Sequence, residues 1–279
     1  MLSDKINSLP ISQTVAMTAK AHDLKNQGID VINAGIGSPD LAPHSSVIRE
    51  LHQQSTKEGA HKYQSYKGID ELRSAFSLWY KNYFNCHLNA DSEILPLMGS
   101  KEGIMHISLA FLNKSDEVLI PDPGYRTYAA AAKMAEANVI KYDLKEDNNW
   151  VPSLSSIEKR NLEKVKIMWV NYPHMPTGAS ANDKDLIEIV KFGKKHNILI
   201  CNDNPYGFIL NNDQKSILQF RNESTEILEL NSLSKSHNMA GWRIGMLAGN
   251  KNLIDSVLKV KSNMDSGMFF AIQKAAVQA

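Results

Sequence analysis

The sequence predicts an α/β fold, in which helices cover both faces of a mostly parallel, seven-stranded sheet. Six short, continuously apolar runs are spread along the 279-residue chain, and helix-like segments separate most of them. Runs this short and this apolar are typical of strands that are buried on both faces. Their alternation with helices is typical of α/β proteins, and the length is sufficient for a large core.

The predicted elements follow one another in a regular order. Residues 1 to about 30 are predicted to form a helical arm, and VINAGIG (31–37) after them is strand-like. Residues 70–84 place Leu72, Phe76 and Tyr80 at helical spacing. The other predicted helices are 100–112, 125–137 and 182–196, and the predicted strands are EILPLM, EVLI, NVIKYDL, VKIMWV, NILIC and EILEL.

RIGMLAG, residues 243–249, is the seventh predicted strand. It follows EILEL too closely for a helical crossover to fit between them. We therefore expect this strand to run antiparallel to its neighbours.

The composition excludes several classes of protein. The formal net charge is +1, which gives no electrostatic case for binding nucleic acid or an anionic membrane surface. Cys86 and Cys201 lie far apart, which argues against a disulfide framework and fits a reducing compartment. No apolar run is long enough to span a bilayer, and the first 30 residues lack the apolar centre of a signal peptide. We expect a cytoplasmic protein.

Polar and glycine-rich segments follow five of the predicted strands. In open α/β sheets, ligands bind outside the carboxyl ends of the strands, so these segments are expected to share one crevice. They are GSKEG (99–103), PDPGY (121–125), NYPHMPTG (171–178), NDNPY (202–206) and the serine-flanked Lys235.

Two features of these segments suit a phosphate group. Gly99, Ser100 and Lys101 open a predicted helix, so they offer free backbone N–H groups and the positive end of the helix dipole. The alternative is a simple helix cap. Arg243 lies eight residues past Lys235 and offers a charge-assisted partner for a phosphate, although a single arginine is more often part of a structural ion pair.

Asp203 ends a strand that is too apolar to leave its carboxylate well solvated. A buried carboxylate needs a positive partner, either an arginine or a cationic ligand atom. Tyr125 and Tyr206 are either core aromatics or rings that contact a flat ligand, and Lys235 is either a solvated turn lysine or a group that meets a carbonyl. Pyridoxal 5'-phosphate satisfies every functional alternative, because it is usually held as a lysine Schiff base with an Asp or Arg at its pyridine nitrogen.

The segment SLSKSHNMAGWRIG, residues 232–245, resembles the lysine signature of the class I/II pyridoxal-phosphate aminotransferases of fold type I. The similarity lies in the serine before the lysine, the spacing to the arginine and the closing glycine. It extends from GIGSPD at residue 35 to Ala279. The resemblance implies that residues 1–42 are an N-terminal arm or part of a small domain, and that residues 43–279 are the cofactor-binding large domain.

The resemblance also implies roles for individual residues. Lys235 would hold the cofactor as a Schiff base, Asp203 would pair with the ring nitrogen and Tyr206 would hydrogen-bond the ring hydroxyl. Tyr125 would stack on the ring. Tyr63, in YQSYKG, matches a tyrosine that reaches the phosphate of the other subunit, which implies a homodimer. The backbone of Gly37 would meet the substrate carboxylate, and the phosphate would contact Ser232, Ser234, Arg243 and the backbone at Gly99, Ser100 and Lys101.

The sequence departs from the family pattern in two places. The asparagine that usually precedes Pro-Thr-Gly and hydrogen-bonds the ring hydroxyl is replaced by Met175, which cannot donate such a bond. Asn171 or His174 would substitute for it, or Tyr206 would act alone. Family members also continue into a C-terminal small domain that carries the arginine for the substrate carboxylate. This chain stops at FFAIQKAAVQA, so we expect that domain to be missing and assign that role to no residue.

The predicted activity is transfer of an amino group between an amino acid and a 2-oxo acid. In this mechanism Lys235 removes the α-proton of the amino donor, and Asp203 keeps the ring nitrogen protonated. A β-lyase on the same scaffold and a catalytically inactive cofactor-binding module are the alternatives. No metal site is predicted, because the histidines show no HExxH or paired spacing. A dinucleotide-binding site is disfavoured, because Gly35-Ile-Gly37 lacks the third glycine.

Overall fold

One seven-stranded sheet forms the centre of the computed structural model, which describes residues 6–7, 9, 13–222 and 224–279. The strand order is β1-β7-β6-β5-β4-β2-β3. Only β7 runs antiparallel to its neighbours β1 and β6, and the other pairs are parallel, as predicted. The strands are β1 (Ile94–Leu97), β2 (Glu117–Asp122), β3 (Asn138–Asp143), β4 (Val165–Val170), β5 (Leu199–Asp203), β6 (Ile227–Ser232) and β7 (Gly245–Gly249).

The helices agree with the predicted segments where a prediction was made. The helix predicted over 70–84 begins and ends at those residues, and those predicted over 100–112 and 182–196 are each one residue shorter in the structure. The helix predicted over 125–137 is confined to Thr127–Met134. The helices are α2 (Gln13–Asn26), α3 (Ser45–Ser55), α4 (Asp70–Phe84), α5 (Ser100–Phe111), α6 (Thr127–Met134), α7 (Leu154–Ile157), α8 (Asp183–His196), α9 (Leu233–Ser236), α10 (Lys251–Lys261) and α11 (Phe270–Gln278).

Local chemistry explains where α8 begins and ends. Asn182 and Asp185 form a reciprocal capping box, in which each side chain accepts a hydrogen bond from the other residue's backbone N–H. Asn197 ends the helix in the left-handed conformation with a φ of 53°. Three basic residues occupy the last turn, where they complement the negative end of the helix dipole.

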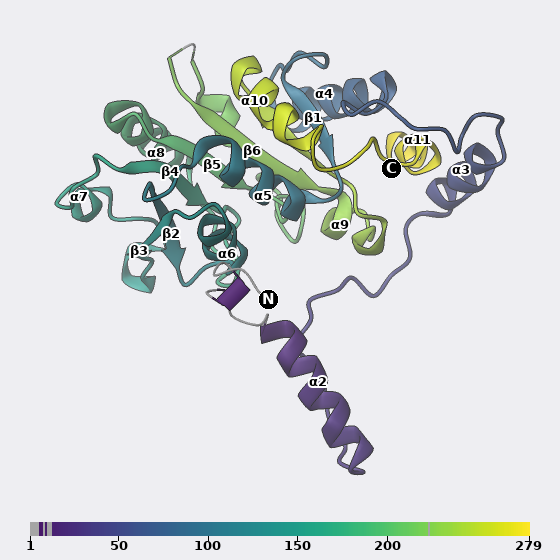
Figure 1. Ribbon diagram of the computed structural model, residues 1–279, viewed down its shortest axis with the longest axis horizontal. Helices are drawn as coiled ribbons and strands as arrows, with labels where there is room; N and C mark the ends of the chain where they lie inside the picture. The colour runs from purple at the N-terminus through teal and green to yellow at the C-terminus, as the bar shows by residue number, and fades with distance from the viewer. Residues whose placement is uncertain (1–5, 8, 10–12, 223) are drawn as a thin grey trace.

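The two faces of the sheet carry two separate hydrophobic clusters. Along β4, Ile167 and Trp169 pack in one cluster, whereas Met168 and Val170 pack in the other. The first cluster includes side chains from α5, α6 and α10, and the second includes side chains from α4 and α8. Figure 1 shows α5 and α10 together over one face. This two-sided burial explains why the strand sequences are apolar throughout.

The prediction of a strand over residues 31–37 is wrong. This segment forms no strand in the structure, and Ile32 is 92% exposed. Its apolar residues have no sheet edge beside them, because the segment belongs to an extended arm. The predicted helical arm is present as α2, although residues 1–5, 8 and 10–12 of the prediction lie outside the described residues.

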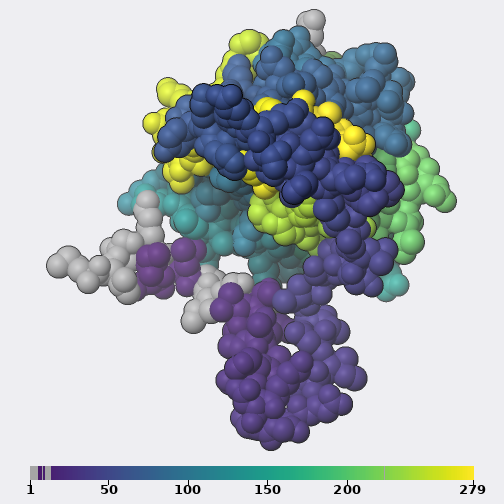
Figure 2. Space-filling model, turned by 90° about the vertical axis from the view of Figure 1, so that its right-hand side faces the viewer, coloured from purple at the N-terminus to yellow at the C-terminus, as the bar shows by residue number. Residues whose placement is uncertain are grey.

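The arm containing α2 extends away from the body of the molecule (Figures 1 and 2). It exposes several apolar side chains, among them Val15, Ile32 and Leu41, which are 62%, 92% and 69% exposed. Among the described residues, no helix has the length and apolar character needed to cross a membrane.

Candidate active site

The polar segments noted in the sequence meet at one edge of the sheet. β5 ends at Asp203 and the parallel strand β6 ends at Ser232, with Asp203 paired to Leu230. β7 begins at Gly245, which pairs with both Ser232 and the last residue of β1, Leu97. The antiparallel direction of β7 therefore brings its first residues to the edge where β1, β5 and β6 end.

At one end of this edge, Gly99 and Arg243 are in close contact. Gly99 is the N-cap of α5 and has a φ of +83°, a conformation that L side chains rarely adopt. A Cβ atom on Gly99 would lie 2.2 Å from Nη2 of Arg243, so the guanidinium lies directly against the glycine backbone. Arg243 Nη1 donates a hydrogen bond to the carbonyl oxygen of Ala240 at 2.8 Å. The arginine is thereby held beside the start of the helix.

Two buried serines lie at the same place. The hydroxyl of Ser232 donates to the hydroxyl of Ser234 at 2.9 Å, and Ser234 in turn lies 3.5 Å from Arg243 Nη1. A Cβ atom on Gly245 would lie 2.8 Å from the backbone nitrogen of Ser100. The backbone N–H groups of Ser100 and Lys101, the first two of α5, have no partner within the helix. These donors, the serine hydroxyls and the guanidinium together can hold a phosphate dianion.

Lys235 lies in α9, three residues after the end of β6. Burial, and then the charge of Arg243, lower the pKa of its ammonium group below the usual value. Its Nζ donates a hydrogen bond to the carbonyl oxygen of Gly37, which brings the segment at Gly37 to the lysine from far away in the sequence. The lysine amine is thus half-buried and close to Arg243, which is part of the proposed phosphate site.

Asp203 is a buried carboxylate with one unsatisfied oxygen. Tyr128 donates to its Oδ2 at 3.0 Å, but Oδ1 has no hydrogen-bond partner. Burial raises the pKa of Asp203 to about 7, Glu229 adds to the rise, the bond from Tyr128 opposes it, and no cation contributes. A buried carboxylate in this state needs an N–H donor or a positive charge from a ligand.

Aromatic residues surround Asp203. The half-buried Tyr206 has a raised pKa, caused first by burial and then by the charges of Asp203 and Tyr125. The ring of Tyr125 meets that of Tyr128 edge to face, with centroids 5.6 Å apart. Tyr128 stacks on Trp169 at 4.8 Å. The roles of Tyr128 and Trp169 were missed in the sequence, because both residues occur within apolar segments and resemble core aromatics.

The carboxamide of Asn171 is fully engaged within the protein. Its Nδ2 donates to the backbone oxygens of Asp203 and Pro173, and its Oδ1 accepts from the backbone N–H of Met175 at 2.8 Å. His174 is buried, and its Nδ1 bonds the hydroxyl of Thr177, whereas its Nε2 has no partner. His174 Nε2 is therefore the polar side-chain atom of this segment that remains available.

Two other predicted site residues are exposed. The ring of Tyr63 is 93% exposed and packs against no other described aromatic ring. The side chain of Lys101 is also exposed, so its contribution to a phosphate site is limited to the backbone.

A cofactor with a phosphate at one end and a protonated aromatic nitrogen at the other satisfies both ends of this crevice. The phosphate would contact Arg243 and the first turn of α5, and the ring N–H would satisfy the orphaned Oδ1 of Asp203. Pyridoxal 5'-phosphate has these groups, and its aldehyde reacts with lysine. The fold and the site together define a pyridoxal-phosphate enzyme.

Comparisons with known proteins identify the family. The family model for aminotransferase class I and II matches residues 29–279. The LL-diaminopimelate aminotransferase of Dehalococcoides mccartyi is 40% identical over the whole chain, which covers 72% of that relative. The enzyme of the same name from Aquifex aeolicus is 40% identical over 99% of the chain. The chain belongs to the class I and II aminotransferases and is a pyridoxal-phosphate-dependent aminotransferase.

Solved structures agree with this family. Substrate-bound BacF from Bacillus subtilis superimposes with a TM-score of 0.95 at 30% identity, over 99% of this chain and 70% of that one. The aspartate aminotransferase of Thermus thermophilus with maleate gives 0.93 at 26% identity, over 100% of this chain and 72% of that one. The predicted fold type I is therefore confirmed.

Proposed function

We propose that this aminotransferase transfers an amino group from LL-diaminopimelate to a 2-oxo acid such as 2-oxoglutarate. The supporting observation is that enzymes with this donor in their name are 40% identical to the chain across essentially its whole length. The aspartate aminotransferase of Thermus thermophilus is 26% identical over the same length.

A panel of amino donors tests this proposal. The cofactor-loaded protein is mixed with 2-oxoglutarate and LL-diaminopimelate, meso-diaminopimelate, L-lysine or L-aspartate, and glutamate formation is measured. We expect the highest kcat/KM for LL-diaminopimelate, by about tenfold or more. A higher value for L-aspartate would contradict the proposal. Release of pyruvate and ammonia without an oxo acid would indicate a β-lyase instead.

Each residue of the crevice has a distinct role in this reaction. When bound, pyridoxal phosphate supplies an aldehyde that combines with amines and a ring that accepts electrons from the α-carbon. Lys235 would hold the cofactor covalently, and its lowered pKa favours the unprotonated amine that would remove a proton from the donor's α-carbon. Asp203 would keep a proton on the ring nitrogen, Tyr206 would hydrogen-bond the ring hydroxyl, and Tyr125 would pack on the ring.

Met175 cannot donate the hydrogen bond to the ring hydroxyl that an asparagine at this position would donate. Met175→Asn should therefore tighten pyridoxal-phosphate binding about fivefold, because one added hydrogen bond contributes about 1 kcal/mol. The measurement is the dissociation constant of the cofactor. The control is a cofactor analogue that lacks the ring hydroxyl, for which the gain should disappear. An equal gain with the analogue would contradict this explanation.

A homodimer with shared sites is also part of the proposal. The exposed ring of Tyr63 and the exposed apolar side chains Val15, Ile32 and Leu41 of the N-terminal arm support it, because a second copy would cover them. In such a dimer Tyr63 reaches the phosphate bound to the partner. Gly37, held at Lys235, stays beside the substrate carboxylate.

Mixed dimers test whether the sites are shared. Lys235→Ala and Tyr63→Ala chains carry different affinity tags and are produced together. A dimer with one chain of each kind then has one site with both residues intact. Random mixing should therefore recover about a quarter of the wild-type activity from two weakly active variants. Activity no higher than the average of the two parents would show that Tyr63 acts within its own chain or not at all.

A cytoplasmic location completes the proposal. Cys86 and Cys201 are both buried and unpaired, which fits a reducing compartment.

A further inference from the structure

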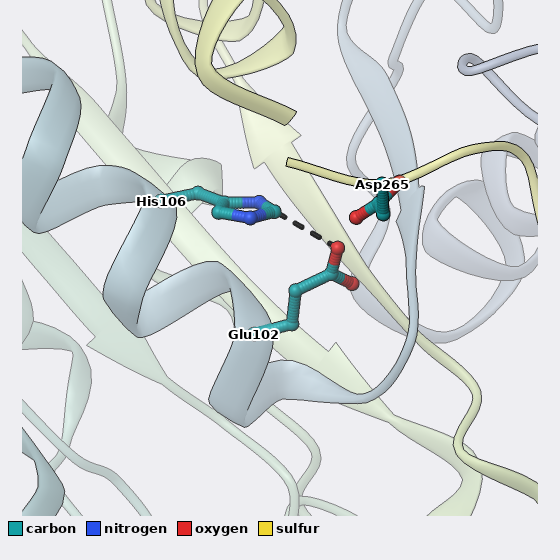
Figure 3. Close-up of side chains that lie close together, drawn as sticks. All are labelled: Glu102, His106 and Asp265. Carbon is teal, nitrogen blue, oxygen red and sulfur yellow. Dashed lines mark ion pairs between the residues drawn. The ribbon is translucent and has the colours of Figure 1, made fainter. Parts of the chain in front are cut away.

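A buried ionic cluster lies beside the first turn of α5. Lys261, the last residue of α10, is 1% exposed, and its Nζ donates to Glu102 Oε1 at 2.9 Å. The same ammonium group contacts the two carboxylate oxygens of Asp265 at 2.8 and 2.9 Å. Figure 3 shows Glu102 and His106 on α5, with Asp265 facing them from the segment after α10. These four residues are called the Glu102 cluster below.

The cation of the Glu102 cluster is the lysine. Glu102, His106 and Asp265 offer possible metal-ligand atoms within 4.8 Å of one another, but the ammonium of Lys261 already contacts both carboxylates. His106 Nδ1 lies 3.6 Å from Glu102 and has no hydrogen-bond partner. Burial and the charge of Lys261 lower the pKa of His106, which favours the neutral imidazole. Lys261 is therefore the cation of the cluster, and its single positive charge is shared between the two carboxylates.

Glu102 connects this cluster to the proposed phosphate site. It is the third residue of α5, and its Oε2 accepts a hydrogen bond from the backbone N–H of Met98, immediately before Gly99. This bond fixes the turn that leads to the helix start. The same carboxylate also brings a negative charge to the end of the helix where a phosphate dianion would bind.

The charge on Glu102 has opposite effects on the helix and on the ligand. A carboxylate in the first turn stabilises a helix, but it repels an anion at the same end, and the repulsion is strong where little water screens it. Burial and the neighbouring Asp265 raise the pKa of Glu102 to about 7, so the group is ionised above that pH. A buried cation at its other oxygen, Oε1, would reduce the repulsion while leaving the bond between Oε2 and Met98 in place.

We propose that Lys261 is a positioning residue for the cofactor phosphate. It holds Glu102 against the turn before Gly99 and offsets part of the negative charge of Glu102 and Asp265, so that the start of α5 keeps its attraction for a dianion. This inference rests on the proposed phosphate site at Gly99, Ser100 and Arg243.

The test compares two ligands that differ only in the phosphate. Cofactor-free protein at pH 8.5 and low salt is titrated with pyridoxal 5'-phosphate and with pyridoxal. Lys261→Met should weaken binding of the phosphorylated ligand about tenfold and change pyridoxal binding less than about twofold. Glu102→Gln keeps an oxygen for Met98 but loses the charge, so binding should stay equal or become tighter. The double variant should return to within about threefold of wild type.

Lys251→Met is the matched control, because Lys251 lies on the same helix and pairs with Asp255 at the surface. It should change neither dissociation constant. Weaker binding by Glu102→Gln, or equal weakening of both ligands by Lys261→Met, would overturn the inference. If Lys261→Met does not fold, the sign of the Glu102→Gln effect decides alone. Wild-type protein that binds neither ligand would instead contradict the proposed function.

Discussion

Replacing Lys235 with alanine should reduce the rate of amino transfer about 10³-fold, within the range that removal of a general base usually costs. The amine is half-buried beside Arg243, and both surroundings lower its pKa, which increases the share of the unprotonated amine at a given pH. The substitution leaves a methyl group in place of the amine, which is the group that would bond the cofactor and move the α-proton. The measurement is kcat with LL-diaminopimelate and 2-oxoglutarate at saturating cofactor.

Chemical reduction identifies the lysine independently of activity. Borohydride treatment of the loaded enzyme, followed by peptide mass analysis, should place the cofactor mass on the peptide that contains Lys235. Lys191→Ala is the control, because Lys191 is exposed on α8 and paired with Glu188. It should retain normal rates and normal labelling. Full activity of Lys235→Ala, or label on another lysine, would refute the assignment.

Asp203→Asn should reduce the activity of the loaded enzyme by about 10² to 10⁴-fold. A neutral amide cannot keep a proton on the ring nitrogen, although it has nearly the same shape and can still accept from Tyr128. Cofactor-free protein should show the opposite response, because its Asp203 is buried without a positive partner. The same substitution is thus expected to harm catalysis and to stabilise the protein without cofactor.

The stability effect depends on pH in a defined direction. Because the pKa of Asp203 is about 7 in the folded state and 3.8 in its reference state, the folded protein binds this proton more tightly. The contribution of Asp203 to stability is fully present below about pH 4 and is lost as the pH rises through 7, a change of roughly 4 kcal/mol. About 3 kcal/mol of this change falls between pH 5 and pH 8, and urea unfolding of cofactor-free wild type and Asp203→Asn at these two pH values measures that part. An equal pH slope in both proteins would contradict the predicted origin.

Glu229 provides a contrast on the neighbouring strand. Its buried carboxylate accepts hydrogen bonds from Tyr80, Asn202, Ser216 and the backbone N–H of Ile217, at 2.7 to 3.0 Å. Glu229→Gln should therefore destabilise the protein by about 2 kcal/mol, because an amide NH₂ group cannot accept these bonds. The opposite effects of Asp203→Asn and Glu229→Gln on the free energy of unfolding would distinguish a carboxylate without a hydrogen-bond partner from one whose hydrogen bonds are all made.

Much of the fold could be predicted from the sequence because the burial of a strand or helix shows in the apolar pattern of its own residues. VKIMWV is apolar at nearly every position because β4 packs on both faces, and α4 carries its buried residues at helical spacing. The strand prediction for VINAGIG was wrong because the local sequence does not show what each apolar residue packs against. A short apolar segment looks like a strand whether it packs in a sheet or on another surface. Only the structure shows that residues 31–37 form no strand.

The site could be predicted in part. Lys235, Asp203 and Gly99 follow strands, and the edge rule for α/β sheets places such residues together. The contact between Tyr128 and Asp203, and that between Lys261 and Glu102, join residues far apart in sequence. Neither contact leaves a local pattern, because a tyrosine in an alanine-rich helix and a lysine at a helix end are both ordinary.

The position of β7 also determines the order in which the chain can assemble. β1 lies at the margin of the sheet and hydrogen-bonds to β7 alone, although about half of the chain, residues 98–244, separates them. Such distant pairings form slowly, since a long loop must close first. During synthesis, β1 therefore has no strand to pair with until β7 has emerged, and the proposed phosphate site between Gly99 and Arg243 cannot form before then. Binding of the cofactor would accordingly indicate that the sheet is complete.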